Sequence, residues 1–148
     1  MVDTKRQTEL NQALELLHFA FRAVVARPDK ILAGRGLGRV HHRILYFIGR
    51  HPDCSVHDLL QKLNISRQAL NEPLRELQSH NLVQYSLSAK DRRIKQLRLT
   101  SQGVKLEDLL SGDQRARFSA TFKRVGRSKE NNWREIMALL ANESGIPD

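Results

Sequence analysis

Side chains suited to reading nucleic-acid bases occur at helical spacing in the stretch NISRQALNEPLREL, residues 64–77. Leu70, Leu74 and Leu77 recur at i, i+4 and i+7, which predicts one buried helix face. The opposite face is predicted to carry Gln68, Asn71, Glu72, Arg75 and Ser79. Amides such as Gln68 and Asn71 can form paired hydrogen bonds with adenine. Arg67 or Arg75 can reach guanine or a phosphate. The alternative is an ordinary solvent-exposed helix face.

A helix-turn-helix is predicted immediately around this face. Ser55 begins the segment SVHDLLQKL as an N-cap, with Asp58 at the spacing of a capping box. The three residues NIS then form a turn that leads into Ser66, a second N-cap. At a helix start, Ser66 can offer its hydroxyl to a phosphate beside free backbone N–H groups. The alternative role for Ser66 is that of a cap alone.

Pro73 lies in the middle of the second helix, where proline has no N–H to donate to the carbonyl of Ala69. Such a residue costs about 3 kcal/mol in a helix interior. Either the helix ends near Glu72 or it kinks and continues. Leu74 and Leu77 keep the register of Leu70, which favours a kink. We expect the kink to set how residues 66–72 approach a DNA groove.

A basic loop follows between two alternating runs. The runs LVQYSLS (82–88) and KQLRLT (95–100) predict a β-hairpin, because apolar residues alternate in each. Its turn carries Lys90, Asp91, Arg92 and Arg93. An arginine gains energy from the strong negative potential of a narrow minor groove. The alternative is a loop that is merely solvated.

The remaining segments have apolar residues at helical spacing, which predicts helices with an apolar face to bury. A helix is predicted over residues 4–25, with Pro28 just beyond its end, and another over 39–50 after the glycine-rich loop 34–38. Further helices are predicted at roughly 101–110, 112–125 and 128–142, separated by SGD and GRS. Because a single amphipathic helix must bury its apolar stripe, we expect the outer helices to pair with a second copy.

Charge is concentrated in the middle of the chain. The 148 residues carry a net charge of +9. Residues 34–100 hold twelve Lys and Arg against five Asp and Glu, which is +7 of that total. Such a concentration fits a surface for polyanions, nucleic acid first, or simply a basic surface that keeps the protein soluble. Composition alone does not decide between them.

The order of these elements and one motif resemble the MarR family of winged-helix transcriptional regulators. The most specific part is D-x-R-x5-L-T-x2-G, present as Asp91, Arg93, Leu99, Thr100 and Gly103. It follows the entry I-S-x3-[VL] of the recognition helix, present as Ile65, Ser66 and Leu70. The resemblance covers most of the chain.

The resemblance implies a homodimer whose N- and C-terminal helices interlock and whose subunits each present one winged helix to DNA. It also implies that Asp91 and Arg93 hold the shape of the wing. Arg92 is then the candidate for insertion into the minor groove, and Arg93 has a shared structural and phosphate role. Glu72 departs from the family, which often has a basic residue there, so we leave it out of the predicted contacts.

Sensor and catalytic sites have weaker support. His51, Cys54 and His57 are spaced H-x2-C-x2-H, but no fourth ligand is evident, so no metal is predicted. No neighbour that would lower the pKa of Cys54 can be identified, which disfavours a redox switch. His41 shares a stripe with Ile44 and Ile48 and is expected to be buried. Trp133 is expected in a dimer core. No catalytic arrangement or cofactor motif is found.

The sequence therefore predicts a mainly α (α+β) fold: a winged helix-turn-helix whose N- and C-terminal helices form a dimerisation domain. The predicted boundaries are 1–36 for the N-terminal helix and linker, 37–103 for the winged helix, and 104–148 for the C-terminal helices. The predicted function is that of a sequence-specific dimeric repressor on a near-palindromic duplex, released by a small molecule or an oxidant. The alternative is a winged-helix protein-interaction or dimerisation module. A single cysteine, no apolar leader and no membrane span fit the cytoplasm. The DNA contacts are predicted to be Ser66, Arg67, Gln68, Asn71, Arg75, Lys90, Arg92 and Arg93.

Overall fold

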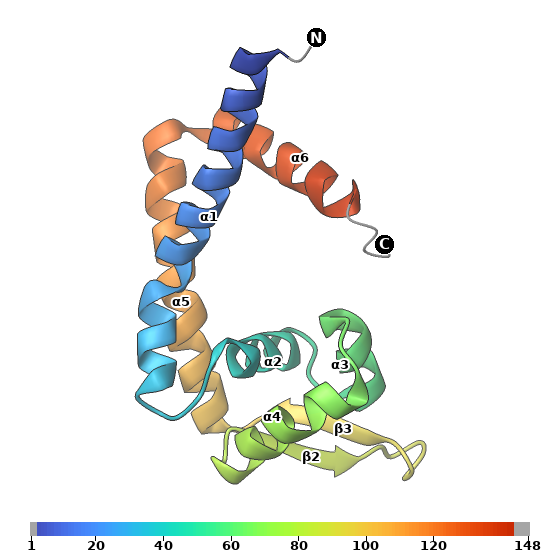
Figure 1. The fold of residues 1–148 in the computed structure, drawn as a ribbon. Helices are drawn as coiled ribbons and strands as arrows, with labels where there is room; N and C mark the ends of the chain where they lie inside the picture. The colour runs from blue at the N-terminus through green and yellow to red at the C-terminus, as the bar shows by residue number, and fades with distance from the viewer. Residues whose placement is uncertain (1–2, 144–148) are drawn as a thin grey trace. The chain divides into compact units, whose positions relative to one another are not determined.

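The computed structural model describes residues 3–143 in two compact units, one up to Asp113 and one from Gln114 onward. Its elements are α1 (Thr4–Ala33), α2 (Arg39–Arg50), β1 (Cys54–Ser55), α3 (Val56–Leu63), α4 (Arg67–Ser79), β2 (Val83–Leu87), β3 (Lys95–Leu99), α5 (Ser101–Val125) and α6 (Arg127–Glu143) (Figure 1). The predicted mainly helical fold with a small sheet is confirmed. No helix within residues 3–143 is long and apolar enough to cross a membrane.

The predicted boundaries after residues 36 and 103 separate dimerisation segments from the DNA-binding segment. The two compact units, which meet after Asp113, are defined by packing and do not test these functional boundaries, so the boundaries stay predictions. Parts of the two predicted end segments, residues 1–2 and 144–148, lie outside the described residues.

The first unit is built around one core of leucine and isoleucine. Its side chains come from the end of α1, from α2, α3 and α4, from the base of the hairpin and from the first turns of α5. The most deeply buried members are at most 2% exposed: Leu32, Ile44, Leu45, Ile48, Leu59, Leu70, Leu77, Leu82, Leu97, Leu106 and Leu110. Burying one such side chain contributes about 1.5–3 kcal/mol. This core holds the helix-turn-helix and the hairpin on one scaffold.

The predicted hairpin is confirmed, but the sheet has a third strand. β2 and β3 pair antiparallel with Val83 opposite Leu99. β1 pairs with the other edge of β3, with Cys54 opposite Leu97. β1 is only two residues long, which is too short for an alternation of apolar and polar residues to predict it from the sequence. Tyr85 and Leu87 are exposed although Val83 is buried, so the hairpin extends beyond the core as a wing (Figure 1).

Two predicted helix ends are wrong. Pro28 does not follow the first helix but lies inside α1, which continues to Ala33. Pro28 is itself buried and Leu32, one turn later, is completely buried, so packing offsets the lost hydrogen bond. The SGD segment does not interrupt α5, because a glycine such as Gly112 costs only about 1 kcal/mol in a helix and Leu110 anchors the turn before it.

The start of α5 is joined to the start of the wing by the L-T-x2-G motif. The Thr100 hydroxyl accepts the Gly103 N–H at 3.0 Å and donates to the Asn81 carbonyl at 2.6 Å. The Thr100 N–H donates to the Leu82 carbonyl at 3.0 Å. A Cβ on Gly103 would lie 2.0 Å from that same Leu82 oxygen. The motif therefore has a structural explanation, since glycine is required for this backbone approach.

Gly103→Ala should destabilise the protein by about 2 kcal/mol or more, because the Leu82 backbone must move to admit the methyl group. Thermal unfolding should shift down by roughly 5–10 °C. Gly38→Ala is the matched control, since a Cβ there meets nothing within 4 Å and the backbone is extended. Equal melting temperatures for the two variants would contradict the assignment.

Candidate nucleic-acid interface

The predicted helix-turn-helix is formed by α3 and α4. Ser55 Oγ accepts the Asp58 N–H and the Asp58 carboxylate accepts the Ser55 N–H, both at 3.0 Å, so the capping box is confirmed. Asn64 ends α3 in the left-handed region with φ 51°. Ser66 Oγ accepts the Ala69 N–H at 3.1 Å and caps α4. These local bonds fix the direction in which α4 leaves the turn.

The leucine spacing of α4 predicts a buried leucine face and an exposed polar face, and the structure confirms both. Leu70, Leu74 and Leu77 are buried. All eight predicted DNA contacts are exposed: Ser66, Arg67, Gln68, Asn71, Arg75, Lys90, Arg92 and Arg93. α4 does not end at Glu72, because the helix continues through Pro73 to Ser79. Whether Pro73 also redirects the first turns of α4 stays a prediction.

A hollow of about 500 Å³ separates α4 from the wing. It is lined by Ser55, Val56, His57, Arg67, Asn71, Leu74, Arg75, Gln78, Tyr85, Arg93, Ile94 and Lys95. Four of these twelve residues are arginine or lysine and none is acidic. Of the predicted contacts, the hollow brings together Arg67, Asn71, Arg75 and Arg93. Such a lining favours an anionic chain passing between helix and wing.

The hollow is also lined by residues that were not among the predicted contacts, including His57, Gln78, Tyr85 and Lys95. The Lys95 ammonium lies 4.9 Å from the centre of the Tyr85 ring. The Tyr85 hydroxyl donates to Gln78 Oε1 at 3.3 Å, which joins β2 to α4. His57 reaches the hollow from the first turn of α3. The alternation of β2 could have placed Tyr85 on the wing, but no sequence signal pairs it with Gln78.

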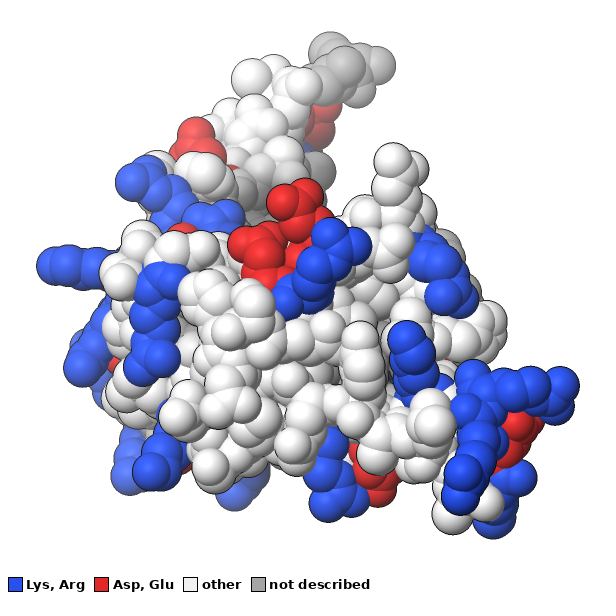
Figure 2. Space-filling view, turned by 90° about the horizontal axis from the view of Figure 1, so that it is seen from below, with Lys and Arg blue, Asp and Glu red and all other residues white. Residues whose placement is uncertain are grey.

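The wing tip is held by the motif residues. The Asp91 carboxylate accepts the Arg93 backbone N–H at 3.0 Å and two guanidinium N–H groups at 3.1 Å. These bonds lower the pKa of Asp91 and raise that of Arg93. Lys90 and Arg92 are exposed and have no ion pair among the described residues. Figure 2 shows basic side chains grouped at the end of the wing.

The two flanks of α4 differ in charge. By the 100° step of a helix, Arg67, Asn71 and Arg75 lie toward the wing, Glu72 lies near the middle of the outer face, and Glu76 lies on the flank toward α2. Contacts support this division, since Arg75 lines the hollow and Glu76 approaches His41 of α2. The positive flank therefore belongs to the hollow, and the carboxylates are kept out of it.

The alternative sensor residues do not converge. His51 and Cys54 line one hollow near the end of α2, whereas His57 lines the hollow beside α4. Within residues 3–143, no group of three His, Cys, Asp or Glu is placed to hold a metal ion. Burial, and then the charge of Asp58, raises the pKa of Cys54, which opposes formation of a reactive thiolate. His41 is buried, as predicted.

Comparison with known proteins also supports a DNA-binding role for this surface. The sequence model of the MarR family matches residues 35–94, from the loop before α2 to the wing. The HTH-type transcriptional regulator PetP of Rhodobacter capsulatus is 36% identical over 132 residues, which cover 89% of this chain and 80% of PetP.

Solved structures share the fold. FabT of Streptococcus pneumoniae, in complex with DNA, has a TM-score of 0.80 at 17% identity, covering 92% of this chain and 97% of FabT. NadR in complex with 4-hydroxyphenylacetate has a TM-score of 0.68 at 26% identity, covering 84% of this chain and 89% of NadR. The winged fold, the cationic hollow and the similarity to a regulator that is 36% identical over 132 residues lead to the same conclusion. The chain therefore belongs to the MarR family and is a DNA-binding transcriptional regulator.

Proposed function

We propose that this regulator is a cytoplasmic homodimeric repressor that binds a near-palindromic duplex and does not catalyse a reaction. The observation that carries the proposal is the hollow between α4 and the wing, whose lining has four cations and no carboxylate. A winged helix can place its helix in the major groove and its wing in the adjacent minor groove. One DNA strand would then pass through the hollow, with its phosphates beside the arginines.

Each predicted contact has a role in this arrangement. Gln68 and Asn71 are proposed to read base edges in the major groove, while Arg67 and Arg75 bind phosphate or guanine. The Ser66 oxygen already accepts the Ala69 N–H, which leaves its hydroxyl proton for a phosphate. At the wing, Lys90 and Arg93 are proposed to bind phosphate and Arg92 to enter the minor groove.

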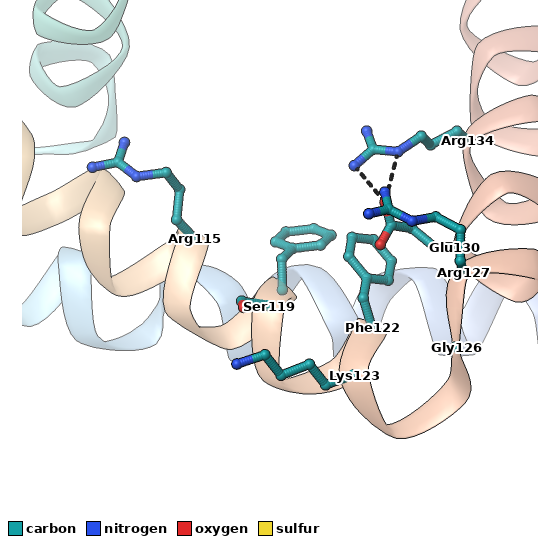
Figure 3. Close-up of a pocket in the computed structure, with 9 residues that line it drawn as sticks. Arg115, Ser119, Phe122, Lys123, Gly126, Arg127, Glu130 and Arg134 are labelled. Carbon is teal, nitrogen blue, oxygen red and sulfur yellow. Dashed lines mark hydrogen bonds and ion pairs between the residues drawn. The ribbon is translucent and has the colours of Figure 1, made fainter.

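The proposed dimer partner is a second copy of the chain. In the second unit, Phe118, Phe122 and Trp133 pack together with ring centres 5.4–5.6 Å apart. Figure 3 shows Phe122 pointing into the hollow between α5 and α6, with Arg115 and Arg134 on its two sides. The α6 side chains Ile136, Leu139 and Leu140 are exposed. An apolar surface of this kind needs a covering partner in water.

Charge indicates which segment of the second copy covers this surface. The hollow of the second unit is lined by four basic side chains and one acid, Glu130. Residues 7–21 of α1 contain Glu9 and Glu15, no lysine or arginine, and a series of exposed leucine and phenylalanine side chains. We therefore propose that this acidic, apolar stretch of α1 contributes to the dimer contact with the cationic, aromatic hollow.

A small-molecule effector is proposed in preference to an oxidant. The related NadR binds 4-hydroxyphenylacetate, which supports regulation by a small molecule in this chain as well. An oxidant would act most readily on a low-pKa thiol, whereas the pKa of Cys54 is raised. A ligand screen on the DNA-bound protein, with release of the duplex as the readout, would identify the effector.

Selection of bound duplexes from a random pool, followed by titration against salt, tests this function. A repressor should yield a near-palindromic consensus and lose affinity about 10³-fold or more between roughly 50 and 200 mM salt, if it contacts six or more phosphates. A protein-interaction module, for which Glu72 and Pro73 would be the best arguments, should yield no consensus. Weak binding that is equal for all duplexes would refute the proposal.

Pro73→Ala tests whether the proline directs the helix. The substitution restores an N–H for the Ala69 carbonyl and should stabilise the protein by about 1 kcal/mol or more. If Pro73 sets the direction of residues 66–72, affinity for the selected duplex should change. The measurement is duplex affinity alongside thermal unfolding, and a stabilised variant with unchanged affinity would argue against the directing role.

Arg92→Ala tests the wing insertion. The variant should lower duplex affinity and reduce the dependence of log affinity on log salt by about one unit for each bound subunit. Lys5→Ala is the matched control, since it removes one exposed charge from α1. The insertion role is ruled out if both variants show the salt dependence of the parent protein.

Leu139→Lys tests the dimer surface. A charge at this exposed apolar position of α6 should raise the dimer dissociation constant more than about 30-fold, as loss of an interface hot spot does. Asn131→Lys adds the same charge to an exposed polar position of the same helix and should leave the dimer intact. Sedimentation analysis distinguishes the two, and a dimeric Leu139→Lys protein would exclude this surface.

A further inference from the structure

His41 occupies an unusual position between α2 and the recognition helix. Its side chain is 9% exposed, and its Nδ1 accepts the backbone N–H of Gly38 at 2.9 Å, which caps the start of α2. A ring nitrogen that accepts a hydrogen bond carries no proton. In the neutral ring, the proton is therefore on Nε2, and that N–H points away from the cap.

The Nε2–H has no hydrogen-bond partner in the described part of the chain, although the atom is buried. Its nearest carboxylate oxygen is Oε1 of Glu76, 3.6 Å away, which is beyond hydrogen-bonding distance. Buried donors without a partner are rare and need an explanation. A shift of well under 1 Å in the Glu76 side chain would close this gap, and that side chain is 41% exposed.

DNA supplies a reason for Glu76 to move inward. The major groove is about 12 Å wide and an α-helix with its side chains is about 10–12 Å across. Both flanks of α4 therefore come close to phosphates. The wing-side flank carries Arg67 and Arg75, but the other flank carries Glu76, which phosphates repel. A carboxylate on that flank is better placed when it turns away from the DNA and accepts an N–H.

The residues before His41 connect this point to α1. The Arg39 guanidinium forms two hydrogen bonds with the Asp29 carboxylate of α1, at 2.9 and 3.2 Å. Leu32, before the glycine-rich loop, and Leu37, within it, are buried in the core. The start of α2 is therefore anchored to the end of α1, and His41 lies two residues after Arg39.

We propose that His41 is a positioning residue whose buried Nε2–H binds the Glu76 carboxylate when α4 enters the major groove. The two atoms lie 3.6 Å apart in the free protein and approach to hydrogen-bonding distance in the complex. The contact turns the Glu76 carboxylate away from phosphate and ties the depth of the recognition helix to the α1–α2 junction. This inference rests on the proposed DNA-binding role of α4.

The test compares His41→Asn in two backgrounds, with the full-length protein and the selected duplex. Asparagine at this position can still accept the Gly38 N–H through its oxygen but cannot donate to Glu76. His41→Asn should lower duplex affinity about tenfold or more, which is the effect of losing one hydrogen bond to a charged group. In a Glu76→Ala background the same substitution should change affinity less than about threefold.

Two controls separate this role from general damage to the fold. His51→Asn replaces an exposed histidine at the other end of α2 and should leave affinity unchanged. A fold defect caused by His41→Asn would persist after removal of Glu76, whereas loss of the proposed contact would not.

An imidazole ¹⁵N spectrum of the parent protein supplies a second measurement that needs no variant. The His41 ring should be in the Nε2–H form in the free protein. Saturating duplex should move the Nε2 proton downfield and slow its exchange with water. An unchanged His41 ring, or a tenfold loss that persists in the Glu76→Ala background, would overturn the inference while the DNA-binding function stands. A parent protein that selects no duplex would overturn both.

Discussion

One residue, Leu82, joins the three parts that form the DNA-binding surface. Its N–H donates to the Leu77 carbonyl at the end of α4, at 2.9 Å, and its carbonyl accepts the Thr100 N–H at the start of α5, at 3.0 Å. Its side chain is 2% exposed. Because β2 begins at the next residue, the wing leaves the core at a direction set by α4 and α5 together. The width of the hollow between helix and wing depends on this joint, which Gly103 makes possible.

The charges on that surface are arranged so that only one approach to DNA is favourable. Arginines line the side of α4 that faces the wing, where Arg93 and Lys95 come from the opposite wall. Glu76 lies on the other flank and Glu72 near the middle of the outer face, and neither lines the hollow. If the helix were rotated about its axis by a third of a turn, acidic groups would replace arginines beside the same strand. Since phosphate contacts position a protein and base contacts select its site, this asymmetry sets the orientation in which Gln68 and Asn71 reach base edges.

Local sequence signals predicted the parts of this surface that depend on local chemistry. The capping box at Ser55, the cap at Ser66 and the leucine stripe of α4 each involve residues within one or two turns of each other. Pairings across the fold left no such signal: β1 is only two residues long, and Tyr85 meets Gln78 only because the wing folds back toward α4. Pro28 misled the prediction for a related reason, since burial in the core decides whether a helix continues through proline. The hollow, and the opposed flanks that depend on α2, therefore required the tertiary structure.

The two proposed interfaces, for DNA and for a second copy, share one continuous helix. α5 begins at the Thr100 joint in the first unit and ends among the aromatic side chains of the second. The division between units falls after Asp113, next to Gly112, and glycine is the residue that least restricts the backbone of a helix. Two half-sites on a duplex must be met at a fixed separation of about one helical turn. The stiffness of α5 near Gly112 would therefore affect how well the two subunits meet this separation. A change in stiffness would alter DNA affinity without changing either interface.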